Sequence, residues 1–191
     1  MVLMKNILFI NACLRSNSRT LKLAKEVLNN LDGRIAEVDL YKEDIKPLDK
    51  DALDLRDKAF LENDFSDDYF RYVKQFKEAD EIVIAAPYWD LSFPSVLKIY
   101  LENICINGMS FVYSDEGIPV GLCKAKRLIY VATSGGFIPK DNYAFNYVDS
   151  LAKDFFEIKN TLFIKAEGLD IDGSNAELII DDVIKNIKNI I

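Results

Sequence analysis

The sequence predicts an α/β protein in which five parallel strands alternate with helices. Short continuous apolar runs are the first observation, and 7–10 and 128–132 are examples. Such runs are typical of strands that are buried on both faces of a parallel sheet. The second observation is that stretches with helical periodicity separate the runs. Helical crossovers between successive strands require parallel pairing.

Each element follows from its own local pattern. Strands are expected at 5–11, 34–40, 81–86, 127–132 and 162–166, and helices at 18–31, 95–106 and 142–156, with a last helix that opens at Ser174–Glu177. In the first helix the expected buried stripe is Leu21, Ala24, Leu28 and Leu31.

The remaining segments carry weaker signals. A short helix is expected at Asp51–Leu61, within an acidic stretch that caps one face of the sheet or an interface. Ser66 is expected to cap a helix that carries Tyr69, Val73 and Phe76, and Ser174–Glu177 fits a capping box. Residues 109–120 look like a short two-stranded excursion from the main sheet.

The length of 191 residues suits one domain, residues 1–191. Five strands in one small domain favour the doubly wound order 2-1-3-4-5, with the switch point between the first and third strands. Polar alternation in 34–40 indicates an edge strand.

Composition narrows the classes of function. The net charge is −7 with no long basic run, so nucleic acid is not an expected partner. No apolar stretch approaches the ~20 residues that span a bilayer, so no membrane association is expected. Because the amino terminus lacks the pattern of a signal peptide, we expect a cytoplasmic protein.

The chain contains no histidine, which excludes histidine-based triads and most zinc sites. Three distant cysteines, without a C-x-x-C pair, suit reduced thiols. Cys105 is expected in the core, whereas Cys13 lies on the rim of the sheet, where a redox or a ligand-contact role is open. We expect no metal site and no catalytic side chain, and a bound cofactor to carry the chemistry.

Three unusual loops follow the strands that begin near residues 5, 81 and 127. Carboxyl ends of parallel strands share one rim of the sheet, where open α/β sheets bind ligands. The first loop lacks both common glycine-rich nucleotide motifs but offers hydroxyls and a helix amino terminus, which binds anions. An ordinary helix cap is the alternative.

The other two loops suit a flat ring. Tyr88 and Trp89 could stack on a heterocycle or simply pack against helices. Gly135 and Gly136 permit close approach of the backbone to a ligand, or form a plain turn. Together the three loops predict a site for flavin mononucleotide (FMN), which needs a phosphate cradle, a ring platform and backbone donors.

The same motifs, in order over nearly the whole chain, resemble a known family. They are Ser16–Asn17–Ser18, Ala86–Pro94, Phe111–Val112–Tyr113 and Thr133–Ser134–Gly135–Gly136. The chain is similar to the FMN-dependent NADH-azoreductases and NAD(P)H:quinone oxidoreductases. It departs from them at Asp90, where they often carry Asn, at Ser134, where they often carry Arg, and in its shorter phosphate loop.

The resemblance implies a flavodoxin-like homodimer with an FMN near the interface of each subunit. It implies NADH or NADPH as co-substrate and a ping-pong transfer of two electrons to a quinone, azo or nitro acceptor. Exposed apolar groups at Leu53, Leu55, Phe60, Phe65, Phe111 and Tyr113 are expected at the dimer interface. The alternative is a flavodoxin-type electron carrier that has no small-molecule substrate of its own.

Residues are assigned to the cofactor loop by loop. The phosphate is expected at Ser16, Asn17, Ser18 and Arg19, the ring at Pro87, Tyr88, Trp89, Asp90 and Leu91, and the pyrimidine edge at Thr133, Ser134, Gly135 and Gly136.

Overall fold

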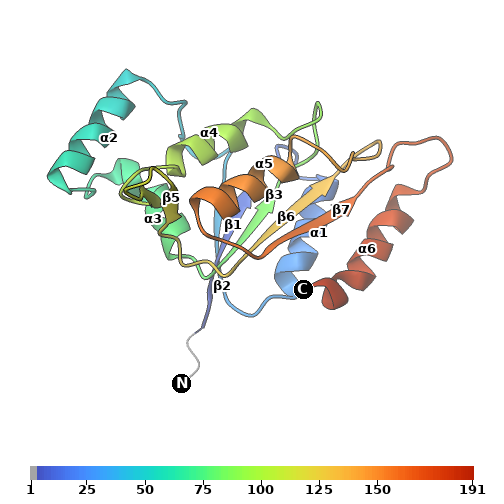
Figure 1. Ribbon diagram of the computed structural model, residues 1–191. Helices are drawn as coiled ribbons and strands as arrows, with labels where there is room; N and C mark the ends of the chain where they lie inside the picture. Colours follow the sequence, from blue (N-terminus) through green and yellow to red (C-terminus); the bar gives the residue numbers. More distant parts are fainter. Residues whose placement is uncertain (1–3) are drawn as a thin grey trace.

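The computed structural model describes residues 4–191 and contains a five-stranded parallel sheet (Figure 1). The strands follow the order β2-β1-β3-β6-β7, which confirms the predicted order 2-1-3-4-5 once the separate hairpin β4-β5 is set aside. The strands of the sheet are β1 (Asn6–Asn11), β2 (Arg34–Asp39), β3 (Glu81–Ala85), β6 (Arg127–Thr133) and β7 (Thr161–Ala166). The antiparallel hairpin is β4 (Phe111–Tyr113) and β5 (Pro119–Gly121).

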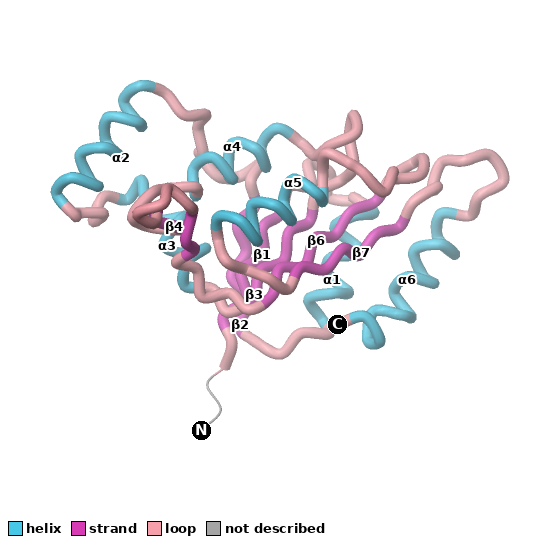
Figure 2. The backbone as a smooth tube through the Cα atoms, in the orientation of Figure 1, coloured by secondary structure: helices cyan, strands magenta, loops and turns pink. Residues whose placement is uncertain are grey.

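Helices cover both faces of the sheet (Figures 1 and 2). Helices α1 and α6 lie together on one face, and α3, α4 and α5 cover the other. The α-helices are α1 (Arg19–Asn29), α2 (Lys50–Glu62), α3 (Arg71–Glu78), α4 (Ser95–Ile104), α5 (Phe145–Ser150) and α6 (Ala176–Ile190). A 3₁₀ turn, η1 (Asp68–Phe70), precedes α3, and a π-helical turn, η2 (Leu151–Phe155), continues α5.

Two apolar cores explain the continuous apolar runs. Ile7 and Phe9 of β1 pack on the side of α1 and α6, whereas Leu8 and Ile10 pack on the opposite side. Successive side chains of a strand point to opposite faces, so a strand covered twice needs apolar residues at every position. Strand β2 lies at the edge of the sheet, as its alternation predicted, and Val38 is its only buried residue.

The predicted buried stripe of α1 was partly wrong. Thr20, Leu23, Ala24, Val27 and Leu28 are the buried residues, whereas Leu21 and Leu31 are half-buried. The side of the helix that contacts the sheet and α6 includes Leu23 and Val27. Leu21 and Leu31 therefore lie at the margin of the buried face.

Three helix starts also differ from prediction because neighbouring side chains cap them. Asp67, not Ser66, accepts the backbone N–H of Tyr69 ahead of α3. Asn175 caps α6 by accepting the N–H of Leu178, so Ser174 and Glu177 form no capping box. Asn142 Oδ1 accepts the N–H groups of residues 144 and 145, which delays α5 to Phe145.

Helix α2 stands away from the sheet beside the β4-β5 hairpin (Figure 1). It confirms the helix expected at 51–61, yet Ala59 is its only buried residue. Arg56 ties it to the body by donating to the Tyr69 hydroxyl at 2.8 Å and to the Glu102 carbonyl at 3.1 Å. Most of its apolar side chains therefore remain open to a further surface.

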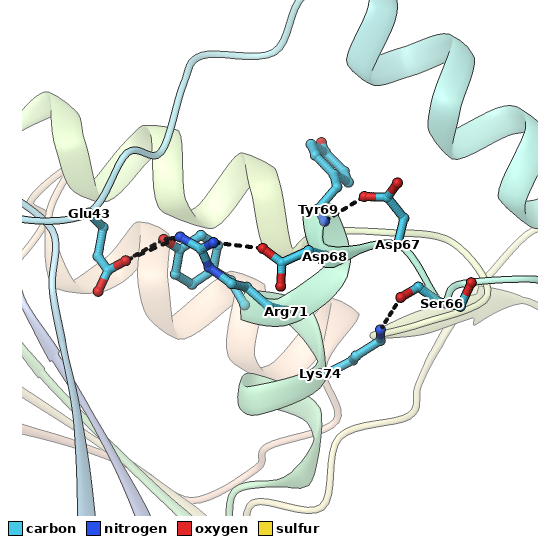
Figure 3. A network of polar contacts seen from close by, with 8 residues as sticks. Glu43, Ser66, Asp67, Asp68, Tyr69, Arg71 and Lys74 are labelled. Atoms are coloured by element: carbon cyan, nitrogen blue, oxygen red, sulfur yellow. Dashed lines mark hydrogen bonds and ion pairs between the residues drawn. The ribbon is translucent and has the colours of Figure 1, made fainter.

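The loop before α2 is held by a polar network around Arg71 (Figure 3). Arg71 donates to Asp68 at 2.8 Å and to the Tyr72 hydroxyl, and Tyr72 donates to Glu43 at 2.6 Å. The network joins the segment after β2 to α3.

Of the helices in the described chain, none is long and apolar enough to cross a bilayer.

Candidate functional site

A cleft of about 530 Å³ opens at the carboxyl ends of β1, β3 and β6. This is the switch point of the sheet, where strand order reverses and open α/β sheets bind ligands. The volume lies in the range of small-molecule sites. Its lining residues are Leu14, Arg15, Asn17, Ser18, Arg19, Thr20, Pro87, Tyr88, Trp89, Thr133, Ser134, Gly135 and Asp170.

The first loop turns directly into α1. Ser18 N–H donates to the Arg15 carbonyl at 3.0 Å, and Ser18 Oγ caps the helix by accepting the Leu21 N–H at 3.3 Å. The N–H groups of Asn17, Arg19 and Thr20 find no acceptor in the described chain. Unpaired donors at a helix amino terminus, with the positive end of the helix dipole, attract an anion.

The second loop is a tight hairpin turn with an unusual backbone. Trp89 and Ser92 exchange two backbone hydrogen bonds of 3.0 and 2.7 Å. Asp90 and Leu91 between them have φ angles of 49° and 66°. Both central residues therefore have a left-handed backbone conformation, as in a type I′ turn. At Leu91 this conformation is sterically strained, whereas glycine would adopt it without strain. The Asp90 and Leu91 N–H groups donate to no acceptor within residues 4–191.

The aromatic residues of this loop have different surroundings. Tyr88 packs partly against the core, and its buried hydroxyl lacks a partner within the described residues. Trp89 stays 41% exposed at the cleft. The alternative of simple packing against helices therefore applies to part of Tyr88 but not to Trp89.

The third loop is fastened to the segment after β7. The carbonyls of Ser134, Gly135 and Gly136 accept the N–H groups of residues 169, 170 and 168 at 3.1, 2.9 and 2.9 Å. The N–H groups of Gly135 and Gly136 remain without an acceptor in the part of the chain that the structure describes. A Cβ on Gly135 would lie 2.5 Å from Asp170 Oδ2, so a side chain there would require the Asp170 carboxylate to move, whereas Gly136 has open space.

The three loops are connected to one another. Tyr88 N–H donates to the Thr133 carbonyl at 3.0 Å, which joins the second and third loops. The hydroxyls of Thr20 and Thr133 lie 2.6 Å apart and are buried, which joins the first and third. The groups that face the cleft are therefore fixed relative to one another.

An ion pair closes one side of the cleft. Arg19 Nη1 and Nη2 donate to the two carboxylate oxygens of Asp170 at 2.8 and 3.0 Å. The Arg19 guanidinium holds the pKa of Asp170 below its usual range. Arg15 supplies a second cationic side chain to the lining.

Cys13 takes no part in the lining. It is buried, its Sγ lies 3.7 Å from the Ala85 carbonyl, and burial raises its pKa to about 11. A thiol is nucleophilic as its thiolate, so this environment makes Cys13 inert. The redox role left open by its position in the sequence is not supported by the structure.

The structure brings together most of the predicted site residues. Asn17, Ser18, Arg19, Pro87, Tyr88, Trp89, Thr133, Ser134 and Gly135 line the cleft, whereas Ser16, Asp90, Leu91 and Gly136 lie beside it in the same loops. The lining residues Leu14, Arg15, Thr20 and Asp170 were not assigned to the cofactor from the sequence. The signal for Asp170 was its position soon after the strand that became β7, on the same rim.

The fold and the cleft define a flavodoxin-type α/β protein. Comparison with family models agrees: residues 5–191 match the family described as having a flavodoxin-like fold, and the chain belongs to that family.

Similar proteins are enzymes by name. The chain is 38% identical over 194 residues to an FMN-dependent NADH:quinone oxidoreductase of Clostridium beijerinckii, covering 97% of each. It is 34% identical to a protein of the same name from Coprothermobacter proteolyticus, covering 98% of each. Its structure matches the azoreductase of Bacillus anthracis with a TM-score of 0.85 and 28% identity, covering 97% of this chain and 98% of that one.

Proposed function

We propose that this chain binds FMN in the cleft and uses it to pass two electrons from NADH to a quinone or azo compound. The observation that carries the proposal is the set of unpaired backbone donors in three loops around one cleft. The names of the similar proteins support the same activity.

The residues present fit each part of FMN. We assign the phosphate to Asn17, Ser18 and the start of α1, where unpaired N–H groups and a helix dipole meet. We assign the ring to the strained turn after Tyr88, whose N–H groups at Asp90 and Leu91 are available. The pyrimidine edge is assigned to Gly135 and Gly136, because their N–H groups lack acceptors in the described chain and Gly136 leaves open space.

The protein's part in the reaction is binding and orientation. When bound, FMN would supply the redox chemistry, taking a hydride (two electrons and a proton) from the nicotinamide and passing both electrons and the proton on to the acceptor. The chain fixes the three loops relative to one another through Thr20, Thr133 and Tyr88, so the groups that would hold the ring keep fixed positions. The chain has no histidine, and we assign its side chains a positioning role.

An apolar rim suits flat acceptors. Leu14, Trp89 and Leu91 are 58%, 41% and 58% exposed around the cleft. Phe137 and Tyr143 are also exposed. Ser92 Oγ donates to the Tyr143 carbonyl at 3.1 Å, which joins the loop before α5 to the turn at Asp90 and Leu91. Exposed apolar groups gathered at a cleft favour a ring-shaped ligand over water.

Steady-state oxidation of NADH with menadione tests the activity. We expect FMN-dependent turnover with parallel lines in double-reciprocal plots, as a ping-pong cycle gives. An electron carrier would instead bind FMN without sustained NADH oxidation, and that result would contradict the proposal.

We further propose a two-fold homodimer, the commonest closed assembly. Leu53 and Phe60 of α2 are each 49% exposed, and Tyr113 of the hairpin is 53% exposed. Phe60 lies over Gly108 at the base of the hairpin, so both elements contribute to one apolar surface. Of the residues expected there, Phe111 is buried at 5% exposure and Leu55 and Phe65 are half-buried, so only the first three remain candidates.

Light scattering at micromolar concentration tests the assembly. We expect the mass of a dimer, and a monomer mass would contradict this proposal. We also propose that residues 1–191 act as one domain, and that the protein works in the cytoplasm, where the three free cysteines would stay reduced.

A further inference from the structure

Arg19 and Asp170 form an ion pair inside the cleft assigned to FMN. The pair is bidentate, at 2.8 and 3.0 Å, and both residues line the cleft. The sequence alone assigned Arg19 to the cofactor phosphate. In the structure its two terminal nitrogens already hold an anion of the protein's own.

The carboxylate is placed by the backbone rather than by attraction to Arg19 alone. The N–H groups of Leu169 and Asp170 donate to the carbonyls of Ser134 and Gly135 at 3.1 and 2.9 Å. Asp170 Oδ2 lies so close to Gly135 that a Cβ there would approach it to 2.5 Å. The loop therefore delivers a negative charge to the boundary between the phosphate loop and the glycine pair.

A carboxylate and a phosphate bind a guanidinium group in the same way. Each offers two oxygens to the two terminal nitrogens of the fork, so one can replace the other. The side chains of Arg19 and Asp170 are 41% and 61% exposed, and exposed ion pairs contribute little to stability. A phosphate dianion beside the unpaired N–H groups of α1 can therefore displace Asp170 from Arg19.

We propose that Asp170 competes with the cofactor's phosphate for Arg19, and that this competition weakens the binding of FMN without affecting the binding of its ring. The inference rests on the proposed FMN site. It makes Asp170 a determinant of how strongly the protein prefers FMN to riboflavin, because riboflavin has the same ring and no phosphate.

The test is titration of the apoprotein and its variants with FMN and with riboflavin, followed by flavin fluorescence. Asp170→Asn keeps the shape and the backbone hydrogen bonds and removes the charge. We expect it to tighten FMN by about three- to fivefold, the size of effect that exposed charge pairs produce. Riboflavin affinity should change by less than about twofold.

A double-mutant cycle separates competition for Arg19 from simple repulsion of the phosphate. In an Arg19→Gln background, Asp170→Asn should no longer tighten FMN. Asp181→Asn is the matched control, since it breaks an α1 ion pair, with Lys22 at 3.6 Å, outside the cleft lining. It should leave both flavins unaffected.

Other results overturn the inference. Unchanged or weaker FMN binding in Asp170→Asn would show that Asp170 does not compete, and an effect that persists without Arg19 would show that it does not act through Arg19. In both cases FMN binding by the unmodified chain would leave the proposed function standing. If the unmodified apoprotein binds no FMN, the proposed function fails as well.

Discussion

The hydroxyl oxygens of Thr20 and Thr133 lie 2.6 Å apart in a buried hydrogen bond between the first turn of α1 and the end of β6. The two residues are 113 positions apart in the sequence. Their bond fixes the loop assigned to the phosphate against the loop assigned to the pyrimidine edge. The relative position of the two loops thus depends on a hydrogen bond between two side chains of the cleft.

Replacing one of the two threonines should show how much their hydrogen bond contributes to stability. Thr20→Val should lower the free energy of unfolding by about 1–3 kcal/mol, because the Thr133 hydroxyl is left buried and unpaired. Urea denaturation measures the change. The double variant Thr20→Val/Thr133→Val is the control, and it should lose less than the sum of the single variants. Additive losses would contradict the pairing.

Ser18→Ala removes a helix cap and a hydroxyl from the phosphate loop. We expect FMN affinity to fall by roughly tenfold, as for one hydrogen bond to a charged group, with riboflavin affected far less. The loss of the cap should lower stability by about 1 kcal/mol. Isothermal titration and thermal denaturation measure the two effects.

Ser18→Gly is the matched control for the cap. Glycine caps helices almost as well as serine, so stability should fall by only a few tenths of a kcal/mol, roughly. FMN affinity should fall as much as in Ser18→Ala, because both variants lack the hydroxyl. Equal losses of FMN and riboflavin in both variants would place the phosphate elsewhere.

Asp90 has a different role from a turn cap. Its carboxylate accepts no hydrogen bond from residues 4–191, and the turn is closed by the backbone of Trp89 and Ser92. Asp90 therefore does not cap the turn through its side chain. Asn also tolerates the left-handed backbone found here, so Asp90→Asn should leave the melting temperature unchanged.

The charge of Asp90 should instead act on the bound flavin. Its removal should raise the flavin reduction potential on the order of 10 mV, since a nearby negative charge opposes reduction. Redox titration measures this, with Asp32→Asn, in the turn after α1, as the control. An unchanged potential would show that the carboxylate does not sense the ring.

The cysteine thiols should be unreactive in the native protein. Burial raises the pKa of Cys13 from 9.0 to about 11 and that of Cys123 to about 12. Neither thiol should react with a disulfide reagent at pH 8 until the chain unfolds. Rapid labelling of native Cys13 would contradict the buried position.

The same shift predicts how stability depends on pH. The folded state holds the Cys13 proton more tightly than the unfolded state, so the contribution to stability is fully present below pH 9.0. It is lost as the pH rises through about 11. Cys13→Ala should flatten this alkaline decline in denaturation curves. An unchanged slope would assign the decline to other groups.

The sheet could be predicted because strands buried on both faces leave continuous apolar runs in the sequence. Ile7–Ile10 and Leu128–Ala132 carry this signal without help from distant residues. Helix starts were less predictable, because several polar residues compete for one cap. Asn142 and Asn175 are the caps because, in the folded chain, their side chains are the ones that accept the free N–H groups.

The site was predictable as three loops but not as a set of contacts. The hydroxyl-rich loop, the aromatic turn and the glycine pair each stand out in the sequence, and topology alone places them on one rim. Asp170 was not found this way, because its one signal, a position soon after the last strand, is shared by any exposed turn residue. Its importance appears only when folding brings it to Arg19 and Gly135.

Titration of the purified apoprotein with FMN and riboflavin tests the central claim most directly. We predict saturation at one FMN per chain at micromolar concentration or below, with the visible absorption bands of a bound flavin and clearly weaker binding of riboflavin. Absence of FMN binding at micromolar concentration, or equal affinity for the two flavins, would contradict the assignment of the cleft.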